Sequence, residues 1–231
     1  MKIPLSPRLL ACCNYVAPGD RVADIGCDHG YLGIYLLTKG IAASVIASDV
    51  KEAPLHSAIH NSEKFGVRDK ISFYLSDGVQ SIPRDFDTMV CAGMGADTMI
   101  SILSSAPWLK REQYRLILQC QSKTPILRQY LSENGWHITE EQVLKDGKFL
   151  YTIMEVIYRP GKILTPGECY FPPELLENPS EDLHAYYRWV VNGLEIITSN
   201  QKETVDPFKK QALEELTNLP PELHWLKEER K

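Results

Sequence analysis

A glycine-containing turn between an apolar strand and an apolar helix constrains this chain more than any other feature. Residues 24–31 have the sequence Asp-Ile-Gly-Cys-Asp-His-Gly-Tyr, with a short strand expected before them and a helix over 32–37 after them. A strand that ends in such a turn and leads into a helix is the first half of a nucleotide-binding α/β unit. We therefore expect Gly26 to allow a sharp turn and close approach to a ligand, and Gly30 to allow close packing between helix and strand.

The turn is acidic, and its acidity narrows the class of ligand. Asp24 closes the strand and Asp28 lies within the turn. Two carboxylates repel a pyrophosphate, which argues against NAD or FAD. S-adenosylmethionine suits the turn better, because it carries a sulfonium and an ammonium cation and no phosphate. A tight turn that binds no ligand is the alternative.

A further acid is expected at the end of the second strand. Residues 43–49 are small and β-branched, and they end on Asp49, 19 residues after Gly30. An acid near this distance contacts ribose hydroxyls in dinucleotide-binding folds, and the same geometry serves the ribose of S-adenosylmethionine. Asp49 would also suit the N-cap of a helix over 51–65.

The third and fourth expected strands also end in polar or glycine-rich turns. Residues 71–75 alternate as in a strand and lead to Asp77 and Gly78, whose carboxylate and N–H suit an adenine, although Asp-Gly is a common turn. Residues 86–92 lead to Gly-Met-Gly at 93–95. Because ligands of open α/β sheets bind at the carboxyl ends of the strands, we expect all these turns to face one crevice.

The remaining sequence predicts an α/β fold, a Rossmann-like sheet with a C-terminal helical appendage. Four further elements are expected: strands over 116–121, from 135 and over 148–159, and a helix over 125–133. Two Pro-Gly pairs mark a change of composition, so we divide the chain into residues 1–164 and residues 165–231. In the second part, apolar residues recur every three or four positions over 182–201 and 208–216, which predicts an antiparallel helical pair.

Charge and composition exclude several classes of protein. Residues 165–231 carry a net charge of −6 and residues 1–164 of +1, so any surface for nucleic acid is a local patch. No apolar run approaches the length of a membrane span, and the first residues do not suit a signal peptide, so we expect a cytoplasmic protein with no membrane contact. The six cysteines form no Cys-x-x-Cys pair; we expect them to be reduced and buried, with no metal site.

Several individual residues have two interpretations. Cys27 lies in the acidic turn and suits a nucleophile, but a small packing residue is the interpretation we favour. Arg8 lies in an expected helix over 5–16 that Ser6 would cap; it can guard a ligand cleft, although a solvated surface arginine is favoured. His184 and His224 are expected to be solvated.

The ordered acids and glycines together resemble a known class. Asp24, Asp49, Asp77 and Gly93 at the ends of strands one to four resemble the class I S-adenosylmethionine-dependent methyltransferases. Asp28 stands where a glycine often stands, which narrows the match. With Asp-Ile-Gly-Cys-Asp-His-Gly-Tyr-Leu, Ala-Gly-Met-Gly at 92–95, Leu-Gln-Cys-Gln at 118–121 and the helical tail, the whole chain is similar to the bacterial tRNA (adenine-22)-N1-methyltransferase family. Cys120 departs from the proline expected in that family.

The resemblance implies S-adenosylmethionine as methyl donor and tRNA as partner, with residues 165–231 helping to bind the tRNA. We assign Asp28 and Met94 to catalysis. Asp49 would bind the donor's ribose and Asp77 with Gly78 its adenine. The whole expected donor site comprises Asp24, Gly26, Cys27, Asp28, His29, Asp49, Asp77, Gly78 and Gly93. For Asp28, stabilising the cation that develops on the base and binding the donor's ammonium group are both open.

The expected product is N1-methyladenine and not N6-methyladenine. Enzymes that methylate exocyclic amines commonly carry an Asn/Asp-Pro-Pro-aromatic loop after the fourth strand, whereas residues 92–95 offer neither an acceptor side chain nor an aromatic ring. Two other functions stay open: a catalytically silent nucleotide-binding module, and a small-molecule methyltransferase. The tail would then serve another purpose such as dimerisation, and the oligomeric state is open.

Overall fold

Seven strands form one sheet in the order β3-β2-β1-β4-β5-β7-β6. In the computed structural model, which describes residues 2–177, 179–199 and 206–227, the strands β1 to β5 are mutually parallel and β7 runs antiparallel to β5 and β6. The strands are β1 (Arg21–Ile25), β2 (Ser44–Asp49), β3 (Ile71–Leu75), β4 (Thr88–Met94), β5 (Arg115–Cys120), β6 (Trp136–Asp146) and β7 (Phe149–Tyr158). The predicted Rossmann-like α/β fold is confirmed.

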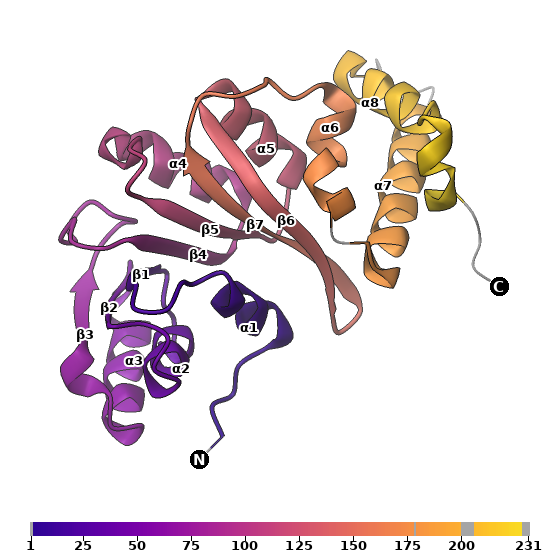
Figure 1. Cartoon of the computed structure of the whole chain (residues 1–231). Helices are drawn as coiled ribbons and strands as arrows, with labels where there is room; N and C mark the ends of the chain where they lie inside the picture. The colour runs from indigo at the N-terminus through magenta and orange to yellow at the C-terminus, as the bar shows by residue number, and fades with distance from the viewer. Residues whose placement is uncertain (1, 178, 200–205, 228–231) are drawn as a thin grey trace.

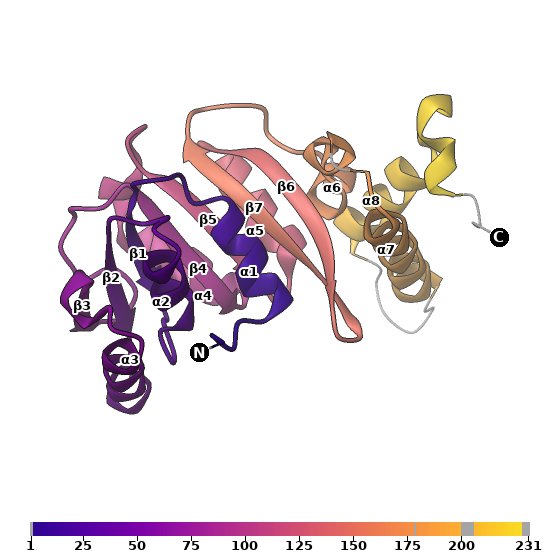
Figure 2. The same ribbon diagram turned by 60° about the horizontal axis from the view of Figure 1, so that its bottom comes forward.

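Helices cover both faces of this sheet (Figures 1 and 2). One face packs against α4 and α5, and the other against α1, α2 and α3. Their bounds are α1 (Pro7–Asn14), α2 (Tyr31–Thr38), α3 (Glu52–Lys64), α4 (Ala96–Ser105) and α5 (Thr124–Glu133), with short 3₁₀ turns η1 (Arg68–Lys70) and η2 (Pro107–Leu109). A strand covered on both faces must be apolar on both; in β1, Ala23 and Ile25 join one core and Val22 the other.

The strand order reverses between β1 and β4. From β1 the chain builds outward through β2 and β3, and it then returns to the other side of β1 to build β4 and β5. Ligands of open α/β sheets bind outside the carboxyl ends of the strands at such a reversal. The turn after β1 and the end of β4 both lie there.

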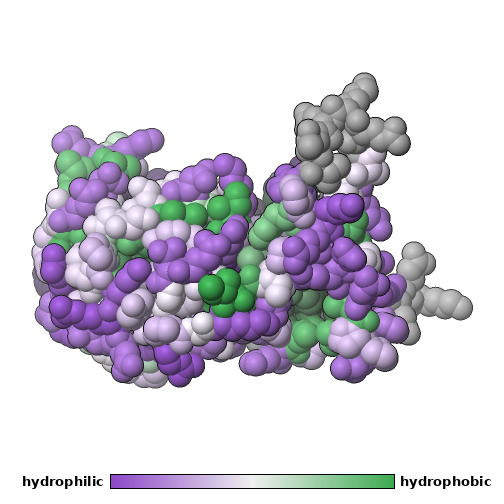
Figure 3. Space-filling view, turned by 90° about the horizontal axis from the view of Figure 1, so that it is seen from above, coloured by the Kyte–Doolittle hydropathy of each residue, from purple (hydrophilic) through white to green (hydrophobic). Residues whose placement is uncertain are grey.

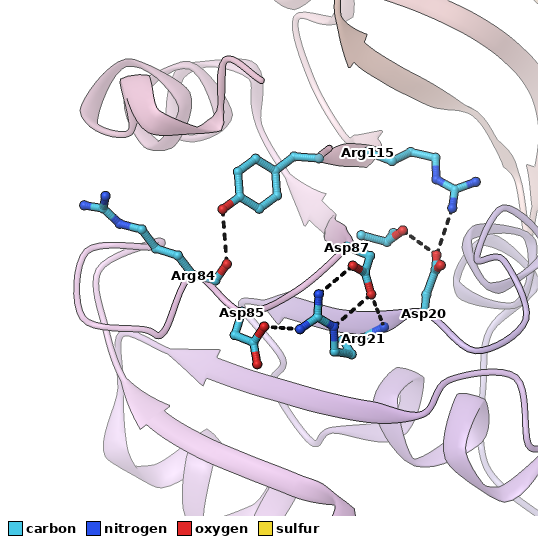
Figure 4. Close-up of polar contacts among 8 residues, drawn as sticks. Asp20, Arg21, Arg84, Asp85, Asp87 and Arg115 are labelled. Carbon is cyan, nitrogen blue, oxygen red and sulfur yellow. Dashed lines mark hydrogen bonds and ion pairs between the residues drawn. The ribbon is translucent and has the colours of Figure 1, made fainter. Parts of the chain in front are cut away.

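Ion pairs link the central strands at their amino ends, opposite the carboxyl ends where the strand order reverses (Figure 4). At the start of β1, Arg21 Nη2 lies 2.7 Å from Asp87 Oδ1, and this hydrogen bonding lowers the pKa of Asp87. Asp20 Oδ2 accepts hydrogen bonds from Arg115 Nη2 at 2.9 Å and from Thr88 Oγ1 at 2.6 Å. These contacts join β1, β4 and β5 at their amino ends and fix their alignment, which in turn places their carboxyl ends side by side.

The C-terminal part is helical, as predicted, but it is more than a pair of helices. It comprises α6 (Pro166–Tyr170), η3 (Pro173–Glu177), α7 (Glu181–Ser199), α8 (Pro207–Thr217) and η4 (Pro221–Leu226), and it has its own apolar core. The prediction that His184 is solvated is wrong. Its side chain is buried, its Nε2 lies 3.2 Å from the Trp225 carbonyl oxygen, and its ring stacks on the Trp225 ring.

A buried ion pair joins the sheet domain to this tail. Arg128 of α5 and Glu141 of β6 are both fully buried, with Arg128 Nη2 2.8 Å from Glu141 Oε1. Arg128 Nη1 also donates to the carbonyl oxygens of Cys169 and Tyr170 at 2.9 and 3.0 Å. The sequence division at residue 164 therefore separates two segments that share a buried polar contact.

Seen from above, the surface is mostly hydrophilic, with smaller hydrophobic areas that include the region where the larger body meets the tail (Figure 3). Within the described ranges, no helix is long and apolar enough to cross a membrane.

Candidate active site

The turn after β1 is built from residues in the left-handed backbone region. Gly26, Asp28 and Gly30 have φ angles of 73°, 49° and 71°. Aspartate is one of the few side-chain-bearing residues that adopt this region readily. The left-handed conformation explains why a glycine often occupies the position of Asp28, and why an aspartate can replace it.

Gly30 has a different packing partner from the one expected. A Cβ atom at Gly30 would lie 2.9 Å from Ala58 Cβ of α3, so Gly30 allows the turn to approach a helix, and the predicted contact with a strand is wrong. The close contact between α2 and β2 falls instead at Gly33, where a Cβ would lie 2.9 Å from Val45 Cγ1.

Two cavities lie at the carboxyl ends of the strands. The first, called here the turn cavity, has a volume of about 300 Å³ and is lined by Asp24, residues 26–29 and residues 92–94, together with Arg8, Leu9, Tyr31, Leu32 and Gln121. The second, called the β2–β3 cavity, has a volume of about 320 Å³ and is lined mainly by residues at or after the ends of β2 and β3, among them Asp49, Asp77 and Gly78. Gly26 and Met94 line both cavities.

Met94 lies where the two cavities meet. A Cβ atom on Gly26 would overlap Met94 Cε, so the thioether side chain packs directly on the bare backbone of the turn. The sequence predicted that Gly26 allows a ligand to approach closely. In the structure, the group that approaches Gly26 is the side chain of Met94. Any ligand that spans both cavities must pass Gly26 and Met94.

Asp24 is a buried carboxylate with an unused hydrogen-bonding atom. It is 4% exposed and accepts a hydrogen bond from the Gly33 backbone, while its Oδ2 has no partner among the described residues. Burial raises the pKa of Asp24 to about 7, with smaller contributions from the charges of Asp49 and Asp28. An unpaired buried acceptor is costly, and an ammonium group in the turn cavity would satisfy it, so the site fits the amino-acid end of S-adenosylmethionine.

Asp49 ties the ends of β1 and β2 together. Its Oδ2 accepts a hydrogen bond from the Asp28 backbone N–H at 3.2 Å, and its Oδ1 accepts one from Lys51 N–H at 3.0 Å. The alternative role as the N-cap of α3 is wrong, because α3 begins at Glu52 and Lys51 occupies the cap position. The residue that follows, Val50, is 62% exposed and lines the β2–β3 cavity, where an adenine ring could pack on it.

The predicted strand of residues 86–92 ends later than expected. β4 continues to Met94 through a bulge between Ala92 and Met94, with Gly93 at φ 81°. The Gly93 N–H donates to Oε1 of the fully buried Gln119 at 3.0 Å. Gln119 thus fixes the loop, and Gln121 lines the turn cavity; neither was singled out for the site from the sequence, although both lie in the Leu-Gln-Cys-Gln segment.

Of the two remaining residues of the turn, Cys27 is buried and His29 is exposed. Cys27 is 7% exposed and burial raises the pKa of its thiol, which supports the packing interpretation over the nucleophile. The side chain of His29 is 53% exposed, with Nε2 3.8 Å from Asp28 Oδ1. Across the described part of the chain, no three His, Cys, Asp or Glu side chains gather as ligands for a metal ion.

The comparisons with known proteins agree with this geometry. A family model described as a methyltransferase domain matches residues 5–154. The chain therefore belongs to that family, and with this fold and site it is a class I methyltransferase.

Relatives narrow the class further. The chain is 31% identical over 195 residues to a putative tRNA methyltransferase, MG248, of Mycoplasma genitalium, covering 81% of this chain and 84% of the relative. It is 30% identical over 154 residues to the tRNA (adenine(22)-N(1))-methyltransferase of Bacillus subtilis, covering 66% and 65%. Streptococcus pneumoniae Sp1610, a putative tRNA (m1A22) methyltransferase solved with S-adenosyl-L-methionine, superposes with a TM-score of 0.81 at 30% identity, covering 92% of this chain and 99% of that one. The chain belongs to this tRNA (adenine-22)-N1-methyltransferase family, and the predicted resemblance is confirmed.

Proposed function

We propose that this protein transfers the methyl group of S-adenosylmethionine to N1 of adenine 22 in tRNA. One observation carries the proposal: the acids Asp24, Asp28, Asp49 and Asp77 lie along two adjoining cavities at the strand-order reversal. The relatives of this chain include tRNA methyltransferases, and one of these was solved with the donor.

The donor supplies a methyl group on a cationic sulfur, and the residues of this chain bind and orient it. Asp24 meets the ammonium group in the turn cavity. Asp49 and Asp77 meet the ribose hydroxyls and the adenine amino group in the β2–β3 cavity. Holding the nucleophile and the methyl group in line supplies much of the rate of such a displacement.

The loop at Gly93 and Met94 suits an aromatic ring nitrogen as methyl acceptor better than an exocyclic amine. Adenine N1 has an in-plane lone pair and no proton to remove, so a small loop at Gly93 and Met94 suffices for its approach. The base must leave its stack to reach the cavity. Methylation at N1 creates a positive charge, and the exposed carboxylate of Asp28 lies on the same cavity to stabilise it.

Removing the carboxylate of Asp49 should weaken donor binding. We expect Asp49→Ala to weaken the binding free energy of S-adenosylhomocysteine by about 1–3 kcal/mol, because the ribose hydroxyls lose their acceptor. Calorimetry measures this directly. Asp69→Ala, an exposed acid on η1 outside both cavities, is the control. An unchanged dissociation constant for Asp49→Ala would remove Asp49 from the donor site.

The raised pKa of Asp24 predicts a pH-dependent affinity. Below about pH 7 the carboxyl group is increasingly protonated in the ligand-free protein, whereas an ammonium ligand requires the carboxylate. We expect the affinity for S-adenosylhomocysteine to fall by up to about tenfold per pH unit below that value and to be level above it. Calorimetry between pH 6 and 8 measures the profile, and in Asp24→Asn the affinity should be weak and independent of pH. A wild-type profile as flat as that of the variant would contradict the role of Asp24.

Two assays test the proposed function itself. Calorimetry should show binding of S-adenosylmethionine and of its demethylated product, and none of NAD; tight NAD binding without a response to the donor would overturn the proposal. Labelled methyl groups should then pass to an unmodified tRNA transcript. Donor binding without any transfer would favour the silent module, and transfer only to small molecules would favour the other alternative.

We propose further that the tail, residues 165–231, helps to bind tRNA through a few cations despite its negative net charge. The cations are Arg188, Lys202, Lys209 and Lys210. Arg188 of α7 and Lys210 of α8 are exposed. Lys209 is half-buried, with its Nζ 3.9 Å from Asp206 Oδ2, and Lys202 lies outside the described residues. Deleting the tail would remove buried partners of Arg128, so substitutions test its role better than truncation.

The variant Arg188→Glu/Lys210→Glu should bind tRNA more weakly and with a smaller salt dependence, because phosphate contacts are lost. Donor affinity should not change. Two exposed lysines of the sheet domain, Lys39 at the C-cap of α2 and Lys64 at the end of α3, provide a matched double charge reversal as control. Equal tRNA affinity in the tail variant and the unaltered protein would assign the tail another purpose, such as dimerisation.

A further inference from the structure

The end of β5 directs two glutamine side chains toward the loop at Gly93. Gln119 and Gln121 are two residues apart, and side chains at this spacing in an extended chain lie on the same face of the sheet. Gln121 follows the last residue of β5, and its backbone N–H donates to the Met94 carbonyl oxygen at 2.8 Å. This bond continues the pairing of β4 and β5, and it fixes the point from which the Gln121 side chain extends.

The amide groups of the two glutamines are used differently. Gln119 is fully buried; its Oε1 accepts from Gly93 N–H, and its Nε2 donates to the Cys120 carbonyl oxygen at 3.2 Å. Gln121 is exposed on the turn cavity, and no described residue forms a hydrogen bond with its amide group. A Cβ atom on Gly93 would lie 3.5 Å from Gln121 Nε2, so this amide lies over the loop. It therefore offers one acceptor and two donors to a ligand there.

The strand order separates Gln121 from the acids proposed to bind the donor. Asp24, Asp49 and Asp77 lie at or after the ends of β1, β2 and β3, which occupy one side of β4 in the sheet. Gln121 follows β5, on the other side of β4. A donor held by those acids lies along the first three strands of this order, which leaves the ends of β4 and β5 to the methyl acceptor.

The other side chain from outside the turn that could meet a polar ligand, Arg8, has a different capacity. It lines the turn cavity, its side chain is 28% exposed, and its Nη1 lies 3.1 Å from Asp146 Oδ2, so the expectation of a solvated surface arginine is wrong. A guanidinium has donors and no acceptor. The amino group of an adenine is itself a donor, so the amide oxygen of Gln121 suits it and Arg8 does not.

An acceptor at the amino group of adenine would assist methylation at N1. The amino group is attached to the carbon atom next to N1, and glutamine is one of the side chains that bind adenine through this group. When N1 gains a methyl group, the ring shares its positive charge with the amino group, whose N–H then becomes a stronger donor. A hydrogen bond that strengthens as charge develops stabilises the transition state more than the ground state.

We propose that Gln121 is a catalytic residue for the target adenine: its amide oxygen accepts a hydrogen bond from the exocyclic amino group while N1 faces the donor's methyl group. The inference rests on the proposed methyl transfer and adds the contact that orients the acceptor. The lone pair of N1 forms the new bond to the methyl carbon. The carbon–sulfur bond breaks, and its electron pair stays on the sulfur of S-adenosylhomocysteine. Gln121 gains and loses no proton.

Two variants test whether an acceptor is required at position 121. Gln121→Leu removes the amide, whereas Gln121→Glu keeps an oxygen acceptor and removes the donors. With saturating donor and tRNA, the single-turnover rate should fall by about 10- to 100-fold in Gln121→Leu and stay near that of the unaltered protein in Gln121→Glu. Calorimetry should give unchanged S-adenosylhomocysteine affinity for both, which also shows that they are folded. Gln113→Leu, an exposed glutamine before β5 and outside both cavities, is the control.

A transcript with purine in place of adenine 22 tests the partner of the hydrogen bond. Purine keeps the ring nitrogen N1 and lacks the amino group. Gln121→Leu should slow methylation of the adenine transcript and leave the slower methylation of the purine transcript unchanged, because the contact is already absent there. This comparison is a double-mutant cycle between Gln121 and the amino group. The leucine and glutamate variants decide the need for an acceptor with the adenine transcript alone.

Each other outcome is decisive. An unchanged rate in Gln121→Leu, equal slowing of both transcripts, or a loss in Gln121→Glu as large as that in Gln121→Leu would overturn the assignment. Weaker S-adenosylhomocysteine binding by Gln121→Leu would place Gln121 in the donor site instead. Failure of the unaltered protein to form N1-methyladenosine would overturn the proposed function itself.

Discussion

Replacing Arg128 by methionine should lower the free energy of unfolding by about 3–5 kcal/mol. The substitution would leave the fully buried Glu141 without its cation and would strip the carbonyl oxygens of Cys169 and Tyr170 of a donor. Methionine has a similar length and fills much of the same space, so the loss reflects polar groups more than a cavity. Urea denaturation followed by circular dichroism measures the change.

Two further variants test whether the lower free energy of unfolding in Arg128→Met comes from the buried charge of Glu141. Arg128→Met/Glu141→Leu should recover part of the loss, because an apolar pair leaves no buried charge, while the carbonyl groups stay without a donor. Lys123→Met removes an ion pair to Asp97 whose side chains are 56% and 71% exposed, and it should cost less than about 1 kcal/mol. A loss of under 1 kcal/mol for Arg128→Met would show that the network does not hold the tail to the sheet.

Asp28→Asn should lower turnover by about 100-fold, the scale seen when one preorganised electrostatic contact is removed. The methylated adenine gains a positive charge that the carboxylate stabilises and a neutral amide does not. Asparagine tolerates the left-handed backbone of this position, so the turn and its hydrogen bond to Asp49 should persist. Donor affinity should therefore change little, and single-turnover kinetics with saturating donor measure the effect.

Asp97→Asn provides a matched control for this variant. The side chains of Asp28 and Asp97 are both 71% exposed, but Asp97 lies on α4 and lines neither cavity. Unchanged turnover in Asp28→Asn would exclude the electrostatic role. A loss of donor affinity in Asp28→Asn, with turnover intact at saturating donor, would assign Asp28 to the ammonium group.

The residues of the candidate site that lie at the ends of individual strands were predictable from the sequence. Asp24 is the penultimate residue of β1, Asp49 is the last of β2, and Asp77 follows β3 by two residues. The parallel arrangement alone brings such strand ends to one edge. Their order along the chain therefore predicts their order in space. The helices of the tail followed from the three- and four-residue spacing of apolar positions in the same way.

Contacts between distant segments were not predictable. Arg8 contacts Asp146, which lies 138 residues further along the chain, and His184 packs on Trp225, 41 residues further along. Nothing in the local pattern around either residue distinguishes these partners from solvent. The bulge that lengthens β4 depends likewise on a buried hydrogen bond from Gly93 to Gln119 of the neighbouring strand.

The position of the methyl group on the product tests the central claim most directly. An unmodified tRNA transcript with adenine 22, and one with guanine in its place, should be incubated with the protein and S-adenosylmethionine. Nucleosides should then be released under mild conditions, because alkali can move a methyl group from N1 to N6, and identified by mass spectrometry. We expect N1-methyladenosine from the first transcript and none from the second. N6-methyladenosine as the primary product, methylated guanosine, or equal methylation of both transcripts would contradict the claim.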